Sequence, residues 1–155
     1  MRDLAYYFQI AAEEAEKGMN RGEGGPFGAC VVSPEGAVIS SGHNQVLLND
    51  PTAHAEIQAI RAASDKMNTY DLTGCVLFAT GEPCPMCLSA IIWANIKKVY
   101  YANTVSEAGG IGFRDNRIYE FLRGASADLL ELSHIPDMRC RELYHKYANA
   151  GRPIY

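Results

Sequence analysis

The sequence predicts a three-layer α/β/α domain whose central mixed sheet has about five strands. Short apolar runs alternate with amphipathic helical patterns along the chain. A late strand-helix-strand order also requires a crossover connection and hence parallel pairing in part of the sheet. The 155 residues, 48% hydrophobic and 21% charged, suit a single domain over 1–155 with one main core.

The first part of the chain predicts a helix followed by a hairpin. Apolar residues recur at helical spacing over 4–19, and Asp3 can cap the start of this helix. Two runs rich in small and β-branched residues, 27–32 and 37–41, flank a turn sequence with Pro and Gly at 33–36. We therefore expect the first two strands to pair in antiparallel fashion.

The middle of the chain predicts a helix, a buried strand and a second helix. Pro51 suits the first turn of a helix, with Asp50 as its cap, and this places His54 near a helix N-terminus. The continuous apolar run at 75–79 is typical of a strand covered on both faces, and 88–94 is a helix that is apolar nearly all round.

The last third of the chain is less regular. It predicts a strand at 97–102, a Gly-rich loop at 103–112 and a short helix at 115–122. The segment 126–132 suits a strand or a helix, and a final helix covers about 137–148.

Charge and cysteine content argue against some classes of protein. The formal net charge of -4 supplies no general basic field, so binding to nucleic acid is not expected. Because the five cysteines cannot all pair, we expect Cys30, Cys75 and Cys140 to be small core residues. We find no span long and apolar enough for a membrane and no signal peptide, and we expect a cytoplasmic protein.

The sequence Pro83-Cys84-Pro85-Met86-Cys87 supplies two thiolates at metal-binding spacing beside a predicted helix start. His54 supplies a third ligand, and His-Cys-Cys with one position open is a set used by catalytic zinc. Glu56, two residues after His54, is placed to take a proton from water at the metal and to pass it to a substrate. Alone, the cysteine motif would equally suit a structural zinc site or a redox pair. His43, His134 and His145 lack such neighbours and suit surface or hydrogen-bonded core positions.

The chain resembles the bacterial guanine deaminases of the zinc-dependent cytidine deaminase superfamily over nearly its whole length. The motifs that carry this resemblance are Gly24-Gly25-Pro26-Phe27-Gly28, Asn44, Asn49 through Glu56, Glu82 through Cys87, and Ala108 through Asp115 with Ile118-Tyr119. The zinc motifs also resemble tRNA adenosine deaminases, whereas the segment around Asp115 resembles the guanine deaminase pattern. Arg114 departs from that pattern, where an acidic residue is expected.

The resemblance implies roles for further residues. Asp115 would be a second catalytic carboxylate beside Glu56. Five residues would bind substrate, namely Phe27, Asn44, Ala55, Trp93 and Tyr155. The tail at about 149–155 would cross to a partner in a domain-swapped homodimer. From the residues alone, Phe27 and Trp93 also suit plain packing, Asp115 suits a helix cap, and the terminus could simply fray.

We therefore expect a zinc enzyme that deaminates a free purine base, with guanine converted to xanthine and ammonia. The alternatives are deamination of another amino-heterocycle or nucleoside (cytosine, guanosine or an aminotriazine) and deamination of adenosine in tRNA. A further alternative of a different class is a zinc-stabilised binding domain without catalysis, which would have no need for Glu56.

Overall fold

The computed structural model describes residues 3–126 and 128–155. Its centre is a four-stranded sheet in the order β2-β1-β3-β4. The strands are β1 (Gly28–Val32), β2 (Val38–His43), β3 (Val76–Gly81) and β4 (Lys98–Asn103). β1 pairs in antiparallel fashion with both β2 and β3, whereas β3 and β4 are parallel. The mixed sheet and its opening hairpin are as predicted.

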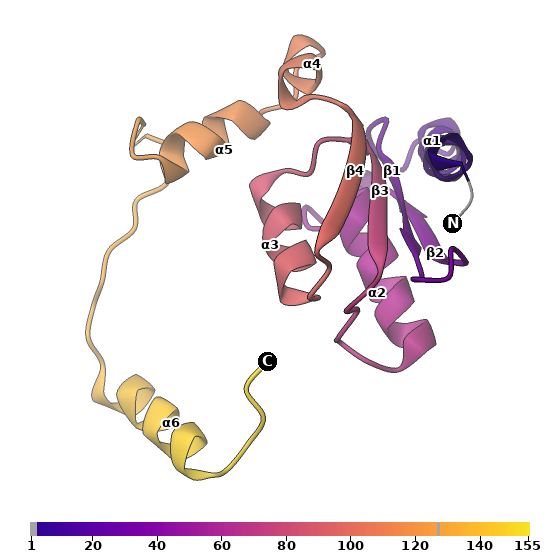
Figure 1. The fold of residues 1–155 in the computed structure, drawn as a ribbon. Coiled ribbons are helices and arrows are strands. Elements are labelled where there is room, and N and C mark those ends of the chain that lie inside the picture. The colour runs from indigo at the N-terminus through magenta and orange to yellow at the C-terminus, as the bar shows by residue number, and fades with distance from the viewer. Residues whose placement is uncertain (1–2, 127) are drawn as a thin grey trace.

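Helices cover both faces of the sheet and form the three layers (Figure 1). α1 (Leu4–Asn20) lies on one face, with Asp3 as its N-cap. α2 (Ala55–Met67) and α3 (Pro85–Trp93) lie together on the other. Both helices that carry the predicted metal ligands therefore share one face, as expected.

The sheet separates two apolar clusters. Alternate side chains of β3 point to opposite faces, so Phe78 packs under α1 with Tyr7 and Leu77 packs under α2 and α3. The Tyr7 and Phe78 ring centroids lie 4.7 Å apart. Small residues such as Ala59 on α2 bring that helix close to the sheet. This packing fixes the starts of α2 and α3, where the metal ligands lie.

The described part of the chain after β4 contains three helices. They are α4 (Val105–Gly110), α5 (Asp115–Leu122) and α6 (Met138–Asn149). We call residues 128–155 the C-terminal arm. Figure 1 shows α6 standing away from the sheet at the end of an extended segment. Apolar side chains of α6, including Leu143 and Tyr144, are exposed. No helix in the described residues has the length and apolarity needed to cross a membrane.

The sheet has four strands rather than about five. The segment 126–132 suited a strand or a helix, but Ser126 and 128–132 belong to neither, and residue 127 lies outside the described residues. The Gly-rich segment 103–112 is also not a plain loop, because Thr104 and Glu107 form a capping box that starts α4.

The start of α2 also differs from the prediction. The helix begins at Ala55, and Pro51 lies in the preceding turn. The Asp50 carboxylate accepts hydrogen bonds from the backbone N–H and the hydroxyl of Thr52, at 2.9 and 2.7 Å, and so stabilises a turn instead of capping the helix. A proline-aspartate pair can signal either structure, and here the local turn is formed.

The three cysteines outside the metal motif have different environments. Cys30 and Cys75 are buried, as predicted, whereas Cys140 is exposed on α6. The prediction for Cys140 was wrong because α6 packs on no sheet face within the described chain. All five cysteines are free.

Candidate active site

The three predicted metal ligands meet between the N-termini of α2 and α3. His54 is the N-cap of α2, Cys84 is the N-cap of α3, and Cys87 lies in the first turn of α3. Pro85 occupies the first helical position, where its missing N–H costs no hydrogen bond. The packing of both helices on one face of the sheet thus unites ligands that are thirty residues apart in sequence.

The geometry of this group fits zinc. The His54 Nδ1 atom lies 3.5 Å from the Sγ atom of Cys84 and 3.5 Å from that of Cys87. Tetrahedral zinc with ordinary Zn–S and Zn–N bonds separates sulfur and nitrogen ligands by about 3.6 Å. All three ligand atoms lie within 4.8 Å of one another. Three protein ligands leave a fourth position of the tetrahedron to water or substrate.

The surroundings favour the ionised form that a metal needs. In the metal-free protein, a hydrogen bond from the Cys87 thiol and one from His54 lower the pKa of Cys84 to about 4, although burial opposes this. The hydrogen bond to the Cys84 thiolate and burial raise the pKa of Cys87. One thiolate is therefore preformed, and metal binding would displace the proton of the other.

Glu56 lies beside the metal group in a nearly dry position. Its side chain is on the first turn of α2, the residue is 7% exposed, and the Cys87 Sγ atom lies 3.5 Å from its Oε2 atom. Burial raises the pKa of Glu56 above the usual range of a glutamate. A carboxyl group with a raised pKa can both accept and return a proton near neutral pH.

The metal group and Glu56 border a cavity of about 600 Å³. Six of the residues singled out in the sequence line it, namely Phe27, Asn44, His54, Glu56, Cys84 and Asp115. They come from the loop before β1, the end of β2, the starts of α2 and α3, and the start of α5. A space of this size can hold a small heterocycle beside the metal group.

Asn44 and Phe27 offer a polar and an apolar wall. The Asn44 Oδ1 atom accepts a hydrogen bond from the Val46 N–H at 3.1 Å, so the Nδ2 hydrogens can donate to a ligand. Phe27 is half-buried and packs edge-on against Phe113, with ring centroids 4.8 Å apart and an interplanar angle of 78°. This pair gives a flat ring the aromatic surface that it can stack on.

Asp115 is the first residue of α5 and does not cap it, because Arg114 holds the N-cap position. Burial, and secondarily the negative charge of Cys84, raise the pKa of Asp115. The Tyr119 hydroxyl donates to the Pro83 carbonyl oxygen at 3.2 Å and ties α5 to the cysteine loop. A second carboxyl group with a raised pKa thus faces the cavity that Glu56 borders.

Glu82 and Phe113 also line the cavity, although no role was predicted for either of them. The Glu82 carboxylate accepts from the Val105 N–H at 2.9 Å and joins the end of β3 to the start of α4. The available signal was its position, directly before the cysteine motif. Phe113 lies in the segment before Asp115 that carried the resemblance, but no local pattern indicated its contact with Phe27, which is remote in sequence.

Four residues of the predicted site do not line the cavity, namely the buried metal ligand Cys87, Ala55, Trp93 and Tyr155. Ala55 is fully buried at the start of α2. Trp93 is 64% exposed at the far end of α3, and Tyr155 is 75% exposed. The rings of Trp93 and Tyr155 lie 6.0 Å apart, so the end of the arm turns back toward α3 of its own chain.

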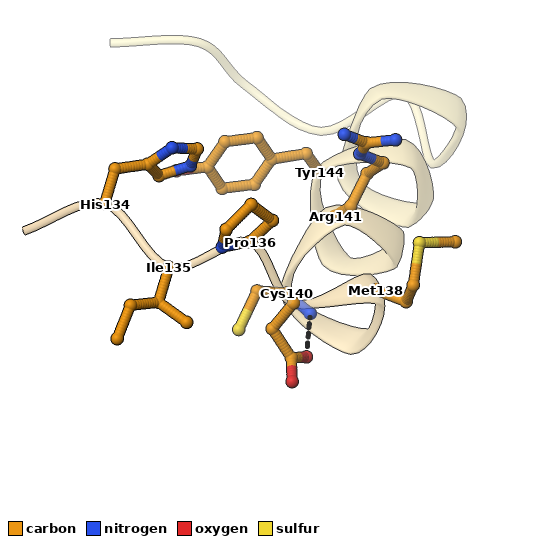
Figure 2. A pocket seen from close by; sticks show the side chains of 8 residues that line it. His134, Ile135, Pro136, Met138, Cys140, Arg141 and Tyr144 are labelled. Carbon is orange, nitrogen blue, oxygen red and sulfur yellow. Dashed lines mark hydrogen bonds between the residues drawn. The ribbon is translucent and has the colours of Figure 1, made fainter.

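A second hollow, of about 390 Å³, lies on the C-terminal arm (Figure 2). It is formed by the extended segment and α6 and shares no lining residue with the first cavity. Its carboxylate, Asp137, is already used as the cap of α6 and accepts from the Arg139 and Cys140 N–H groups. The residues that line this hollow include no metal-binding group and no carboxylate without a hydrogen-bond partner.

The fold and this site define the class of zinc-dependent deaminases. Residues 1–103 match the sequence model of the family described as the cytidine and deoxycytidylate deaminase zinc-binding region. The chain belongs to this family. The matched range contains His54, Glu56 and both cysteines, but ends before Asp115 and the arm.

Similar proteins include both a guanine deaminase and a tRNA-specific adenosine deaminase. The chain is 48% identical over 115 residues to the guanine deaminase of Bacillus subtilis, covering 74% of this chain and 73% of that protein. It is 43% identical over 107 residues to the tRNA-specific adenosine deaminase of Aquifex aeolicus, covering 68% and 70%. A solved structure of Bacillus subtilis guanine deaminase superposes with a TM-score of 0.91, at 37% identity and 99% coverage of both chains. The similarity of fold therefore includes the arm.

Proposed function

We propose that this chain hydrolyses guanine to xanthine and ammonia. The observation that carries the proposal is the placement of Asp115, which faces the cavity that Glu56 and the metal group border. The structural match to a guanine deaminase over 99% of the chain supports it.

The proposed chemistry needs one water and two proton carriers. Bound zinc supplies the Lewis acidity that brings the pKa of a water molecule toward neutrality. Glu56 takes the proton of the attacking water on its carboxylate and delivers it to a ring nitrogen next to the amino-bearing carbon. As the carbon–nitrogen bond breaks, Asp115 gives a proton to the departing amine, which leaves as ammonia, and regains one from the hydroxyl group that water added, so that a carbonyl group forms. The raised pKa of Asp115 keeps a share of this carboxyl protonated for that step.

Binding of the base would rest on Asn44 and Phe27. The amide of Asn44 donates to an acceptor atom of the base, and Phe27 supplies the ring face. The apolar backing of Phe113 holds Phe27 in place. These contacts fix the orientation of a planar heterocycle but do not by themselves select guanine, so the proposal depends on the Asp115 side of the cavity.

Deamination of adenosine in tRNA is the principal rival, given the relative at 43% identity. Such a substrate needs phosphate contacts from unpaired cations. The cations at α6, Arg139, Arg141 and Lys146, are mixed with Asp137 and Glu142, so this helix has no uniformly basic face, and Asp137 pairs with Arg139 at 3.0 Å. The chain as a whole carries a formal net charge of -4. A free base is therefore favoured as the substrate.

A reducing, cytoplasmic location is part of the proposal, since the cysteine ligands are free thiols.

A substrate panel tests the proposal. Ammonia release is measured with the zinc-loaded protein on guanine, guanosine, adenine, cytosine, ammeline and tRNA. We expect guanine to have the highest kcat/KM. Turnover of another substrate with guanine inert would reject guanine as substrate while keeping the deaminase class.

The same panel is repeated with Asp115→Asn, which keeps the shape of the side chain but removes its proton transfer. We expect kcat on guanine to fall by about a hundredfold, the lower range for loss of an acid-base group. Asp65→Asn is the matched control, at an exposed carboxylate on α2 that does not line the cavity. An unchanged kcat for Asp115→Asn would remove this residue from the chemistry.

We further propose a homodimer in which the tail at about 149–155 reaches the partner's active site. The supporting observation is that α6 stands off the body with apolar side chains exposed, among them Met138, Leu143 and Tyr144. A single chain gives these side chains no packing partner comparable to a core. A second copy would supply one.

Removal of Gly151 through Tyr155 is expected to lower kcat/KM for the base by at least about tenfold, because the cavity would lose the group proposed to cover it. Zinc content and dimer mass, measured by elemental analysis and light scattering, should be retained. A variant that lacks only Tyr155 separates the terminal ring from the rest of the tail. Full activity of both truncated forms would place the tail outside the site.

A further inference from the structure

His43 lies in a buried network on the α1 side of the sheet. It ends β2 and is 9% exposed. Its Nδ1 atom lies 3.0 Å from Oε2 of Glu14, and its Nε2 atom lies 2.6 Å from Oε2 of Glu23. The two carboxylates come from different elements, because Glu14 is on α1 and Glu23 is in the segment after it. One imidazole ring thus joins three parts of the chain.

Both ring nitrogens face a carboxylate oxygen, and this requires both to carry a proton. A neutral imidazole has only one N–H and would leave its second nitrogen opposite another acceptor. Burial lowers the pKa of His43, but its hydrogen bonds and charge interactions with Glu14 and Glu23 outweigh this and hold the pKa above the ordinary value. Gly18 leaves room for the ring, since a Cβ atom there would lie 2.9 Å from its Cγ atom.

Other charged groups around this network balance the two carboxylates. From α1, Lys17 binds Glu14 at 2.5 Å. From the segment after α1, the charge of Arg21 acts on Glu23. From the other face of the sheet, the network continues through neutral amides, as Gln45 donates to Glu23 at 2.9 Å and Gln58 of α2 donates to Gln45. The imidazolium is therefore the cation shared by both carboxylates.

This network is connected to two segments that line the proposed substrate cavity. The segment 21–27 carries Glu23 and ends in the cavity-lining Phe27. Its Glu23 carbonyl accepts from the Leu47 N–H at 2.9 Å, and the Phe27 carbonyl accepts from the Asn44 N–H at 3.0 Å. Asn44 directly follows His43. A change in the bond between His43 and Glu23 thus acts on both sides of this wall.

We propose that His43 is a positioning residue whose protonated ring fixes segment 21–27 against Asn44 and so sets the affinity of the site for its substrate. The proposal rests on the proposed deaminase function only for its kinetic readout. Its structural part, the charge state of His43, stands apart from the identity of the base.

The sign of the pH dependence follows from the raised pKa. Below that pKa the ring is an imidazolium and both bonds are present. As pH rises through it, the ring loses one N–H, and segment 21–27 loses one charge-assisted bond. We expect KM to rise above this pKa by about tenfold, the scale of such a bond, and kcat to change by less than about twofold.

Glu23→Gln tests this coupling. Removal of one carboxylate lowers the pKa of His43, so the rise in KM moves to lower pH, whereas a merely structural role would leave its position unchanged. KM and kcat are measured between about pH 6 and about pH 10, where a histidine with a raised pKa titrates. Ionisation of the substrate base affects KM equally in all variants, so it does not change the comparison between them. Glu13→Gln removes the same charge from an exposed position on α1 and should reproduce the wild-type profile.

His43→Gln gives a second variant, since glutamine cannot change its charge. We expect its KM to be raised at all pH values and the pH step to disappear. A step that persists at the wild-type position in both Glu23→Gln and His43→Gln would overturn the proposal.

Nitrogen NMR of histidine-labelled, zinc-loaded protein reads the charge state without any substrate. We expect His43 to show two protonated ring nitrogens at neutral pH, and its titration to move to lower pH in Glu23→Gln. A single neutral tautomer at neutral pH would overturn the proposal even if guanine is deaminated. If guanine is inert but His43 titrates as expected, only the proposed substrate fails, and KM is then measured on the base that the panel identifies.

Discussion

Glu56→Gln is expected to lower kcat by about a thousandfold, within the range for loss of a general acid-base group. The amide keeps the shape of the side chain but cannot take a proton from water. Because burial already raises the pKa of Glu56, the native carboxyl is matched to transfer near neutral pH, and this match is lost in the variant. The measurement is kcat for ammonia release, with zinc content determined on the same sample.

Glu131→Gln, at an exposed carboxylate of the arm, is the matched control and should keep wild-type turnover. Zinc content should be unchanged in both, since Glu56 is not one of the three ligands. If fully zinc-loaded wild type and Glu56→Gln are equally inactive on the whole panel, the chain is a zinc-stabilised binding domain. That outcome would not contradict the fold or the assignment of the three metal ligands.

The metal group could be predicted from sequence because its parts are local. A cysteine pair around Pro85, and His54 two residues before Glu56, place their side chains at helix starts whatever the rest of the fold does. The antiparallel opening hairpin and the parallel pairing through a crossover followed from strand and helix patterns in the same way, whereas the order of the strands was not predicted. The sequence pattern could not show how close His54 lies to the two cysteines. The packing of α2 and α3 on one face of the sheet brings them together.

The remaining features depend on contacts between remote segments. The sequence indicated only that His43 was a surface or hydrogen-bonded core residue, and its partners Glu14 and Glu23 lie twenty and more residues away. Phe113 could not be assigned to the cavity because it packs on Phe27 from the opposite half of the chain. Side-chain pairing of this kind leaves no periodic signal.

The core position predicted for Cys140 was wrong for a related reason. The apolar residues of the arm were expected to be buried in the core of this chain. In the structure the arm leaves the body, and those side chains remain exposed. Hydrophobic patterning shows that a segment will be covered, but not by which surface, so an arm that packs elsewhere gives the same pattern as a strand or a core helix.

Cys87→Ala is expected to weaken zinc binding by at least about a hundredfold, more than the usual loss for a residue that only orients a ligand. The variant keeps only two protein ligands for the four coordination positions of zinc. Ammonia release should therefore fall together with zinc content. Zinc per chain is measured after dialysis. Cys75→Ala is the matched control, because Cys75 is also buried but lies outside the metal group.

Thermal unfolding separates lost metal from lost packing. A ligand that binds only the folded state raises the melting temperature with its concentration, so added zinc should stabilise wild type and Cys75→Ala but not Cys87→Ala. The stabilisation should also shrink as pH falls, because protons then compete for the thiolate of Cys84 and for His54. Equal stabilisation of all three proteins by zinc would mean that the metal binds elsewhere, and the assignment of His54, Cys84 and Cys87 as its ligands would be wrong.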